Sequence, residues 1–428
     1  MYIKSKHENP KEIQHTQQKL AKPVKKPTLS PYEKLSNVQK EFYQILKEDK
    51  YASICAHKRL SVQLLNLNAN PMQQEILFEE MLVRYAHNLA NGCIDLKAMK
   101  KQIKKNRAKE IKSIFHHYDQ KVNENRLLEQ FKSNQYSMKE ILQPYIPNHP
   151  EFLSMIKKLN DTTLDAQQRY VLRLNIERFK LLKSHKTQNF IQLNIPTYRF
   201  EFFEQGSKTV SFGTVVGDFK DQTPILSSTL KYFIVNPTWN IPDSIAKKTI
   251  IPRMLKDKNY LKKKHIEIHK TYDLNSVRYA QQDINWHKYL KKNVRYIPYK
   301  FIQLPYSSNG LGRVKFIFPN DYAVYMHDTI GSWRFKIDKQ KIRAVSHGCV
   351  RLEHPLALIK HISTHYTKRS YASVRKDYDS HKLKTISLSK PLVVHLTYFS
   401  VSLDKENKLN FHKDLYGYDT MQKLNFSF

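Results

Sequence analysis

Apolar residues between about positions 32 and 185 recur at helical spacing. In the stretch 77–89, apolar side chains stand at positions 77, 81, 82, 85, 86 and 89, which places them on one face of a helix. Asn70 is suited to the N-cap, and Pro71 suits the first helical position. Gln73 stands at the capping-box position, and Gly92 can end the helix. The pattern predicts a helical scaffold domain over residues 32–187.

The pattern changes between about residues 186 and 192. Only Gly92 precedes residue 200, while the other eight glycines follow it. Beyond the boundary come strand-like runs divided by Gly, Pro, Asn and Asp, namely TYRFEFFEQG, KTVSFGTVVG, KYFIVNP, RVKFIFPN and AVYMHDT. These runs predict a mainly β domain over residues 188–428, with a mixed, Lys-rich insertion at about 243–304. The expected fold class is therefore α+β.

Residues 1–31 are polar and Lys-rich, with prolines at positions 23, 27 and 31. This composition favours a flexible basic tail. The tail contains no apolar segment of the kind that a secretory signal needs, so no signal is recognisable at this start. No apolar run reaches about 18 residues, and no transmembrane helix is expected.

The charge balance is strongly basic. The chain has 73 Lys and Arg against 38 Asp and Glu, a formal charge of +35, which indicates a positive surface and an anionic partner. The sequence shows no zinc-finger spacing, no RNP-like aromatic strand and no evident recognition helix. Peptidoglycan, anionic lipid and a merely solvated basic surface all remain compatible with this charge.

Three cysteines are present, at positions 55, 93 and 349. An odd number without close spacing argues against a disulfide framework or a metal knuckle. Cys55 and Cys93 stand in helix-like apolar surroundings, where buried inert thiols are the expected outcome. Only Cys349 has neighbours that suggest chemistry.

Those neighbours form the stretch SHGCVR at 346–351, preceded by the strand-like run DYAVYMH that ends at His327. A cysteine nucleophile needs a nearby base, which His327 or His347 could supply. The amides around Gly348 and Cys349 could face a developing oxyanion. The flanking cations Arg343 and Arg351 would favour the thiolate. The residues alone indicate acyl transfer by a Cys/His pair. A histidine and a cysteine with purely structural roles would give the same sequence.

The order of a His, a gap and then Ser-His-Gly-Cys-x-Arg resembles the active-site signature of YkuD-type L,D-transpeptidases. Here 18 residues separate His327 from Ser346, slightly more than is usual, and Arg351 stands where many members have Asn. Further stretches from about 190 to 420 resemble the large periplasmic members of the family. They include NIPTYRFEFFEQG, NPTWNIP, the NGLGR turn, YMHDT, HLTYFSV and DLYGYD.

The helical segment is also similar to the scaffold of those large enzymes. The stretches LQPYIPNHPEFLSMIKKL and YVLRLNIERFKLL are nearly adjacent in this chain. Large relatives commonly carry a small peptidoglycan-binding module in this region, for which this chain leaves no room. The resemblance therefore implies a capped catalytic domain whose substrate is anchored in some other way.

The resemblance assigns roles to individual residues. Cys349 would attack the carbonyl between the third residue of a stem tetrapeptide and its terminal D-Ala, and His327 would act as general base and acid. Tyr325 and His347 would line the site, with Ser346, Gly348 and Arg351 completing the substrate and oxyanion region. No metal and no cofactor are expected.

The expected function is formation of 3-3 cross-links between peptidoglycan stem peptides through a cysteine thioester. Hydrolysis of the same thioester would instead make the protein an L,D-carboxypeptidase. A basic, non-catalytic protein that binds wall polymer or nucleic acid is the other alternative, although nucleic acid is not the expected partner. The family points to the periplasm or cell envelope. The oligomeric state is left open.

Overall fold

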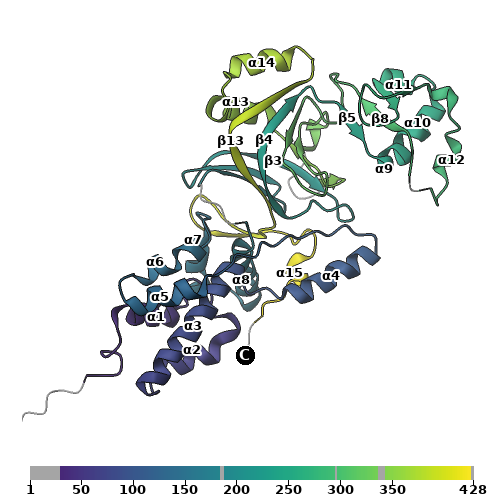
Figure 1. The fold of residues 1–428 in the computed structure, drawn as a ribbon. Helices are drawn as coiled ribbons and strands as arrows, with labels where there is room; N and C mark the ends of the chain where they lie inside the picture. Colours follow the sequence, from purple (N-terminus) through teal and green to yellow (C-terminus); the bar gives the residue numbers. More distant parts are fainter. Residues whose placement is uncertain (1–28, 184–187, 295, 336–342, 426–428) are drawn as a thin grey trace, which may run out of the picture.

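The computed structural model describes residues 29–183, 188–294, 296–335 and 343–425, so the tail predicted at 1–31 lies almost wholly outside the described residues. Figure 1 shows a helical region, a β domain beside it, and a smaller mixed unit at the outer edge of the β domain. This arrangement confirms the α+β class with a helical N-terminal part.

The helical region contains the following helices, in chain order: α1 (Asn37–Glu48), α2 (Lys58–Leu65), α3 (Pro71–Asn91), α4 (Leu96–Ala108), α5 (Glu124–Ser133), α6 (Met138–Leu142), α7 (Phe152–Lys157) and α8 (Ala166–Lys180). The α3 boundaries follow the sequence signals. The Asn70 side chain accepts a hydrogen bond from the Gln73 amide, Pro71 is the first helical residue, and Gly92 is the C-cap with φ +72°.

The apolar stripe of α3 forms part of the core of this region. Met81, Tyr85 and Leu89 are fully buried, as are Leu82 and Ala86, whereas Leu77 at the edge of the stripe is only half-buried. Burying one large apolar side chain contributes about 1.5–3 kcal/mol. The helix is therefore held mainly by its packing against the rest of the bundle.

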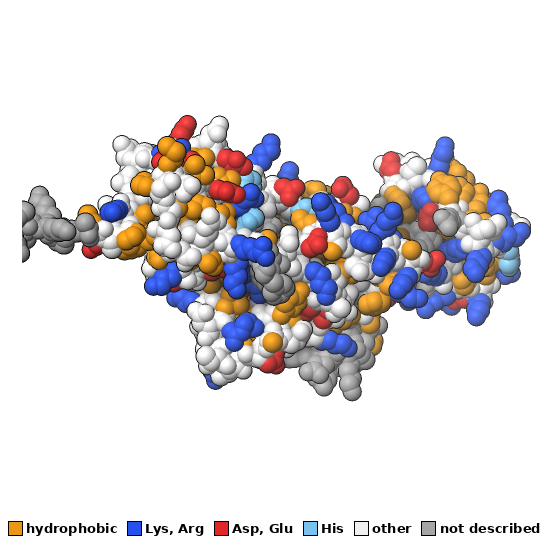
Figure 2. All heavy atoms as spheres, turned by 90° about the horizontal axis from the view of Figure 1, so that it is seen from below, with side chains coloured by type: hydrophobic (Ala, Val, Ile, Leu, Met, Phe, Trp, Pro, Cys, Tyr) orange, Lys and Arg blue, Asp and Glu red, His pale blue; other side chains and the backbone are white. Residues whose placement is uncertain are grey.

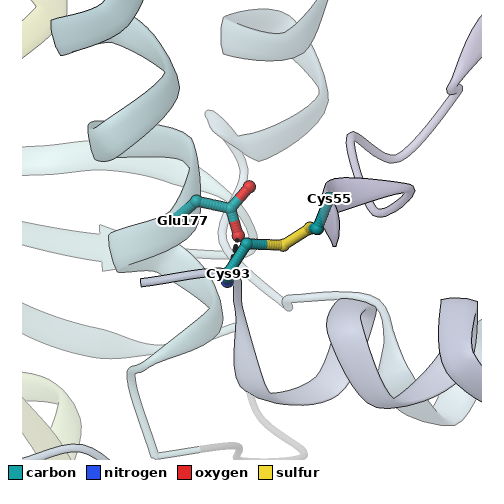
Figure 3. Close-up of side chains that lie close together, drawn as sticks. All are labelled: Cys55, Cys93 and Glu177. Carbon is teal, nitrogen blue, oxygen red and sulfur yellow. Dashed lines mark hydrogen bonds between the residues drawn. A yellow bond between two sulfur atoms is a disulfide. The ribbon is translucent and has the colours of Figure 1, made fainter. Parts of the chain in front are cut away.

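A disulfide joins Cys55 and Cys93 (Figure 3), so the expectation of separate inert thiols was wrong. Cys55 stands just before α2, and Cys93 follows the C-cap of α3. The Glu177 carboxylate of α8 accepts a 2.9 Å hydrogen bond from the Cys93 amide, and it also pairs with Lys180 at 3.0 Å. The fold of the bundle brings together two cysteines that are 38 residues apart.

Within the described residues, the β domain is built on one nine-stranded sheet in the order β11-β3-β12-β10-β9-β4-β13-β1-β2. An additional β2–β3 pairing closes the sheet on itself, with β11 branching from β3. The strands are β1 (Phe190–Asn194), β2 (Arg199–Glu204), β3 (Ser207–Gly217), β4 (Leu226–Val235), β9 (Val314–Ile317), β10 (Met326–His327), β11 (Ala344–Ser346), β12 (Val350–Leu352) and β13 (Lys384–Thr397).

The core of the β domain lies between this sheet and two helices, α13 (Pro355–Tyr366) and α14 (Tyr371–Asp379). Alternate strand residues such as Phe233, Phe316 and Val350 point into this core and are fully buried, because successive side chains of a strand face opposite sides. The residues between them point to the opposite face of the sheet, where side chains can form a site.

The mixed unit extends from β5 (Trp239–Ile241) to β8 (Lys300–Gln303) and has its own hydrophobic core. Its strands pair in the order β5-β8-β6-β7, with β6 at Ile266–His269 and β7 at Arg278–Tyr279. Its helices are α9 (Asp243–Ile245), α10 (Ile251–Lys256), α11 (Tyr260–Lys263) and α12 (His287–Leu290). That this unit caps a substrate groove stays a prediction.

The C-terminal segment returns to the helical region. The hairpin of β14 (Val401–Leu403) and β15 (Leu409–Phe411) packs on the helical core, and Phe399 stacks on Phe179 of α8 with ring centroids 4.2 Å apart. The last helix, α15 (Tyr418–Met421), contacts α4. The two parts thus share apolar packing, and the boundary predicted at 187/188 stays a prediction.

Figure 2 shows Lys and Arg side chains spread over much of one face of the molecule, with fewer acidic groups among them. This distribution agrees with the formal charge of +35. Among the described residues, no helix is long and apolar enough to cross a membrane.

Candidate active site

Three neighbouring strands bring the candidate catalytic residues together. His327 of β10 is the register partner of Arg351 on the parallel strand β12 and of Lys315 on the antiparallel strand β9. The preceding residues in register, Met326 and Val350, are fully buried in the core. Strand alternation therefore puts His327, Arg351 and Lys315 on the face opposite the core.

The same alternation places the candidate nucleophile on that face. Cys349 directly precedes Val350, as Tyr325 directly precedes Met326, and the Val350 amide donates a 3.1 Å hydrogen bond to the Tyr325 carbonyl. Tyr325 and Cys349 therefore lie side by side at the starts of β10 and β12. The Tyr325 side chain is close enough to the cysteine sulfur for each to affect the pKa of the other. The structure brings Cys349, His327, Tyr325 and Arg351 to one face of adjacent strands.

The turn before Cys349 is fixed by Ser346. Its hydroxyl donates a 2.6 Å hydrogen bond to the Cys349 carbonyl and accepts one of 3.2 Å from the Gly348 amide. The Ser346 side chain is buried, so it shapes the turn from within. Because the Gly348 amide already donates to Ser346, Cys349 is left as the candidate backbone donor for an oxyanion.

Gly348 adopts φ +107°, a conformation that residues with a side chain rarely take. The Gly348 carbonyl accepts a 2.9 Å hydrogen bond from Thr223, whose hydroxyl also accepts one of 2.8 Å from the Gly217 amide. The buried Tyr416 hydroxyl donates to the Gly217 carbonyl at 2.7 Å. The C-terminal segment thereby supports the turn that carries Cys349.

His327 is buried, with 4% of its surface exposed. Its Nδ1 hydrogen-bonds the Asp328 backbone carbonyl, so Nδ1 carries the proton and Nε2 is free to exchange one. The Asp328 carboxylate points elsewhere and accepts from the amides of Arg313 and Thr329 at 2.8 and 2.7 Å. A backbone carbonyl, not a carboxylate, orients His327.

The Asp328 carboxylate is seated against Gly312, whose φ is +64°. A side chain added at Gly312 would meet the Asp328 carboxyl carbon at 2.5 Å, so only glycine fits. The neighbouring Leu311 carbonyl is near enough to His327 to affect its pKa. Residues of the NGLGR turn thus contact Asp328 and lie near His327.

Burial, and after it the Arg351 cation, are the main causes that lower the pKa of His327 to about 3. The Asp328 and Leu311 carbonyls oppose this change, and Lys315 adds to it. His327 is therefore neutral at physiological pH. A neutral imidazole can accept a proton, which is what a general base requires.

The thiol of Cys349 is also neutral at rest. Burial raises its pKa, while the Tyr325 backbone, Lys315, the Tyr325 hydroxyl and Arg351 each lower it without prevailing. Arg351 acts in the direction expected, toward the thiolate, but desolvation outweighs the nearby cations. Attack by this sulfur needs a base that removes its proton.

Arg343 does not belong to this group, contrary to expectation. Its guanidinium donates a 2.9 Å hydrogen bond to the Phe335 carbonyl. It lines a separate cavity of about 880 Å³ that is also lined by Tyr198 and His412.

The second cation near the Cys349 sulfur, besides Arg351, is Lys315, which was not predicted from the sequence. The alternation in RVKFIFPN marks Lys315 as facing away from the core, but the strand pairing that sets it beside His327 cannot be read from that run.

The remaining predicted residue, His347, is exposed. It can therefore contact a substrate but is not held in place by burial.

The Tyr325 ring is held between two neighbours. Lys315 Nζ lies 3.8 Å from the ring centroid, and the His327 ring packs edge-on with its centroid 5.8 Å away. These contacts leave Tyr325 little freedom to move.

Within the described part of the chain, one group of side chains has the spacing of a metal site. It consists of Cys55, Cys93 and Glu177, far from the catalytic strands. Its two sulfurs are bonded to each other, so they are not available as thiolate ligands.

The β domain is similar to a known catalytic domain. Residues 188–374 match the family model for YkuD, the L,D-transpeptidase catalytic domain. A Haemophilus influenzae protein named "Putative L,D-transpeptidase" is 28% identical over 281 residues, which are 65% of this chain. The match covers 53% of that protein, so the chain spans about half the length of the curated relative.

Solved structures match the chain only at low similarity. An L,D-transpeptidase from Mycobacterium smegmatis is 13% identical, with a TM-score of 0.20, covering 49% of this chain and 58% of that one. A structure titled "Structure of the Ldtfm-avibactam carbamoyl enzyme" is 9% identical, with a TM-score of 0.18 and 51% of each chain covered. Over residues 188–374 the chain is therefore similar to the YkuD-type L,D-transpeptidase catalytic domain.

Proposed function

We propose that the protein is a peptidoglycan L,D-transpeptidase that forms 3-3 cross-links through a thioester on Cys349. The observation that carries this proposal is the shared face of β10 and β12, on which a neutral His327 and a neutral Cys349 thiol both lie. A buried neutral base paired with a protonated nucleophile is suited to proton transfer during attack.

In the first half of the reaction, His327 Nε2 takes the proton from the Cys349 sulfur as the sulfur attacks the carbonyl before the terminal D-Ala of a donor stem. The carbonyl carbon becomes tetrahedral, and its oxygen gains negative charge. When this intermediate collapses, the C–N bond breaks and His327 gives its proton to the departing amine. D-Ala leaves, and the donor stem is held as a thioester.

In the second half, the side-chain amine of another stem attacks the thioester carbonyl. His327 accepts a proton from that amine, and the C–S bond breaks when the second tetrahedral intermediate collapses. The sulfur leaves as a thiolate and recovers its proton from His327. The products are a 3-3 cross-link and the enzyme in its starting protonation state.

The negative oxygen in each step needs a donor, and we assign the Cys349 amide to it. The Ser346 hydroxyl and the Gly348 amide already bond within the turn, so their role is to hold that donor in place. Fixed donors of this kind commonly contribute about 10²–10³-fold to the rate. Tyr325, Arg351 and the exposed His347 would contact the substrate around the sulfur.

The disulfide supports a location in the cell envelope. Disulfides such as Cys55–Cys93 form and persist in oxidising compartments, of which the bacterial periplasm is one. Peptidoglycan lies on the same side of the inner membrane. Fractionation of cells that express the protein would test this location, and a cytosolic protein with reduced cysteines would contradict it.

Incubation with purified tetrapeptide muropeptides tests the function. Mass spectrometry should detect cross-linked dimers together with free D-Ala, and it should detect neither with a Cys349→Ala variant. Release of D-Ala with tripeptide products alone would show that water resolves the thioester, which would make the protein an L,D-carboxypeptidase. Binding of muropeptides without D-Ala release would contradict both activities.

A further inference from the structure

A groove of about 420 Å³ lies between α4 and the loop that leads into β10. Figure 1 shows α4 below the β domain. The groove is lined on one side by Lys100, Ile103, Lys104 and Arg107 of α4, and on the other by residues 113–116 and Tyr322. None of its lining residues is in β9, β10, β12 or the mixed unit, and the proposed mechanism does not use it.

The cations of the groove stand on one face of α4. Lys100, Lys104 and Arg107 are separated by four and three residues, the spacing at which helical side chains are neighbours. All three are exposed, and none forms an ion pair within the described residues. At 1.5 Å per residue, they extend along about 10 Å of the helix.

One wall of the groove adjoins the segment that contacts the nucleophile. This wall is Tyr322, whose hydroxyl hydrogen-bonds His116. Burial raises the pKa of Tyr322, and Arg107 is near enough to oppose that change. The next residue is Ala323, whose carbonyl lies 3.9 Å from the Cys349 sulfur. One wall of the groove is therefore adjacent in the chain to a carbonyl that contacts the reacting sulfur.

The walls of the groove are fixed by hydrogen bonds. The Asn106 side chain donates to the buried Ser113 hydroxyl at 2.9 Å, which ties α4 to the next segment. The His116 amide donates to the Ile225 carbonyl at 2.9 Å, which ties that segment to the start of β4. The groove thus keeps its shape without a ligand. The nearby acid Asp221 pairs with Lys112 at 2.8 Å, and Asp321 beside Tyr322 is exposed.

We propose that this groove binds the carboxylate-bearing stem peptide of the substrate. The inference rests on the proposed function and names how that substrate is held. An extended peptide advances about 3.3–3.6 Å per residue, so three residues match the length of the row of cations. A peptidoglycan stem carries free carboxylates along such a length, and Lys and Arg side chains pair with them. The groove would thus hold the stem by its carboxylates.

Equilibrium binding tests this proposal without turnover. The full chain with Cys349→Ala is titrated by calorimetry with the tripeptide L-Ala-γ-D-Glu-diaminopimelate and with the same peptide amidated at every carboxylate. The groove variant adds Lys100→Gln, Lys104→Gln and Arg107→Gln. The control variant adds Lys97→Gln, Lys101→Gln and Lys105→Gln, which removes the same charge from other positions of the same helix.

The groove variant should bind the free tripeptide about tenfold more weakly, because three exposed charge pairs are lost. The control variant should bind it like the parent protein, and added salt should weaken the parent more than the groove variant. Glutamine is a good helix former, and matched melting curves of the two variants would show that both are folded.

Equal weakening in both variants, or equally tight binding of the amidated peptide, would overturn the groove assignment. Muropeptide turnover by the protein with Cys349 intact separates the two proposals. Normal turnover with no effect of the groove variant on binding overturns the groove alone. Charge-dependent binding in the groove without any turnover overturns the proposed function alone.

Discussion

His327 and Arg351 are register partners across the parallel strands β10 and β12, and the Arg351 cation is the largest cause, after burial, of the lowered pKa of His327. The same cation lowers the pKa of the Cys349 thiol, which burial raises. One guanidinium thus keeps the base unprotonated and eases deprotonation of the nucleophile. Many family members have Asn at this position.

Arg351→Asn should raise both pKa values, because a positive charge disfavours every protonated form near it. Acylation by the wild-type protein should keep its rate between about pH 7 and about pH 5, since a base with a pKa of about 3 stays unprotonated there. In the variant, the acid limb of the pH–rate profile should move to higher pH. Single-turnover acylation followed over this pH range measures the change.

Arg343→Gln is the matched control, because its guanidinium bonds the Phe335 carbonyl and lies away from the catalytic strands. It should leave the acid limb where the wild type has it. A shift in Arg343→Gln as large as that in Arg351→Asn would contradict the assignment of Arg351 as the cation that acts on His327.

His327→Gln should slow acylation by about 10²–10⁴-fold, the usual contribution of general acid and base assistance. Glutamine keeps a side-chain amide that can donate to the Asp328 carbonyl, so the fold should persist. His347→Gln should cost far less, because that side chain is exposed and bonds nothing that fixes it. Rates of thioester formation by intact mass spectrometry compare the two variants. A greater loss at His347 would mean that the base has been assigned to the wrong histidine.

The helical stripe of α3 and the change to strands were predictable because both rest on local periodicity. The Asn70 cap and the Gly92 end of the helix are local as well. The arrangement of Tyr325, His327 and Cys349 on one face was not predictable from spacing, since it depends on how β10 pairs with β12. The family signature, rather than periodicity, singled out His327 and Cys349.

The failed expectations all depended on distant contacts. Cys55 and Cys93 are 38 residues apart, and only the packing of α2, α3 and α8 brings them together. Arg343 is close to Cys349 in sequence but is directed away from it, whereas Lys315 is distant in sequence and lies across one strand. The sign of the pKa change at Cys349 depends on burial, which a list of nearby charges does not contain.

Replacing both disulfide cysteines with alanine should lower stability without affecting catalysis. Closing a loop of 38 residues is worth about 4 kcal/mol in the chain-entropy estimate. The Cys93 amide bonds Glu177 through its backbone, so that contact survives the substitution. Denaturant unfolding should show a lower midpoint, while muropeptide turnover at low denaturant stays normal. An unchanged midpoint would show that the bridge does not form in the protein.

Covalent trapping tests the identity of the nucleophile. L,D-transpeptidases as a class are acylated by carbapenems at the catalytic cysteine, so the adduct should form on Cys349. A β-lactam carbonyl is a strained acyl donor, and its opening places a negative oxygen where we assign the Cys349 amide. Intact mass spectrometry should show one added carbapenem per chain, and peptide mapping should place it in the segment that contains SHGCVR.

Cys349→Ala removes the sulfur with little change in volume, so this variant should stay folded and unmodified. The other two cysteines are bonded to each other and offer no thiol to the drug, which makes Cys349 the free cysteine of the chain. Reduction would free the Cys55 and Cys93 thiols, which lie in the helical region and not on the strands that carry His327. An adduct that persists in Cys349→Ala, with or without reductant, would therefore show that acylation does not depend on the proposed site.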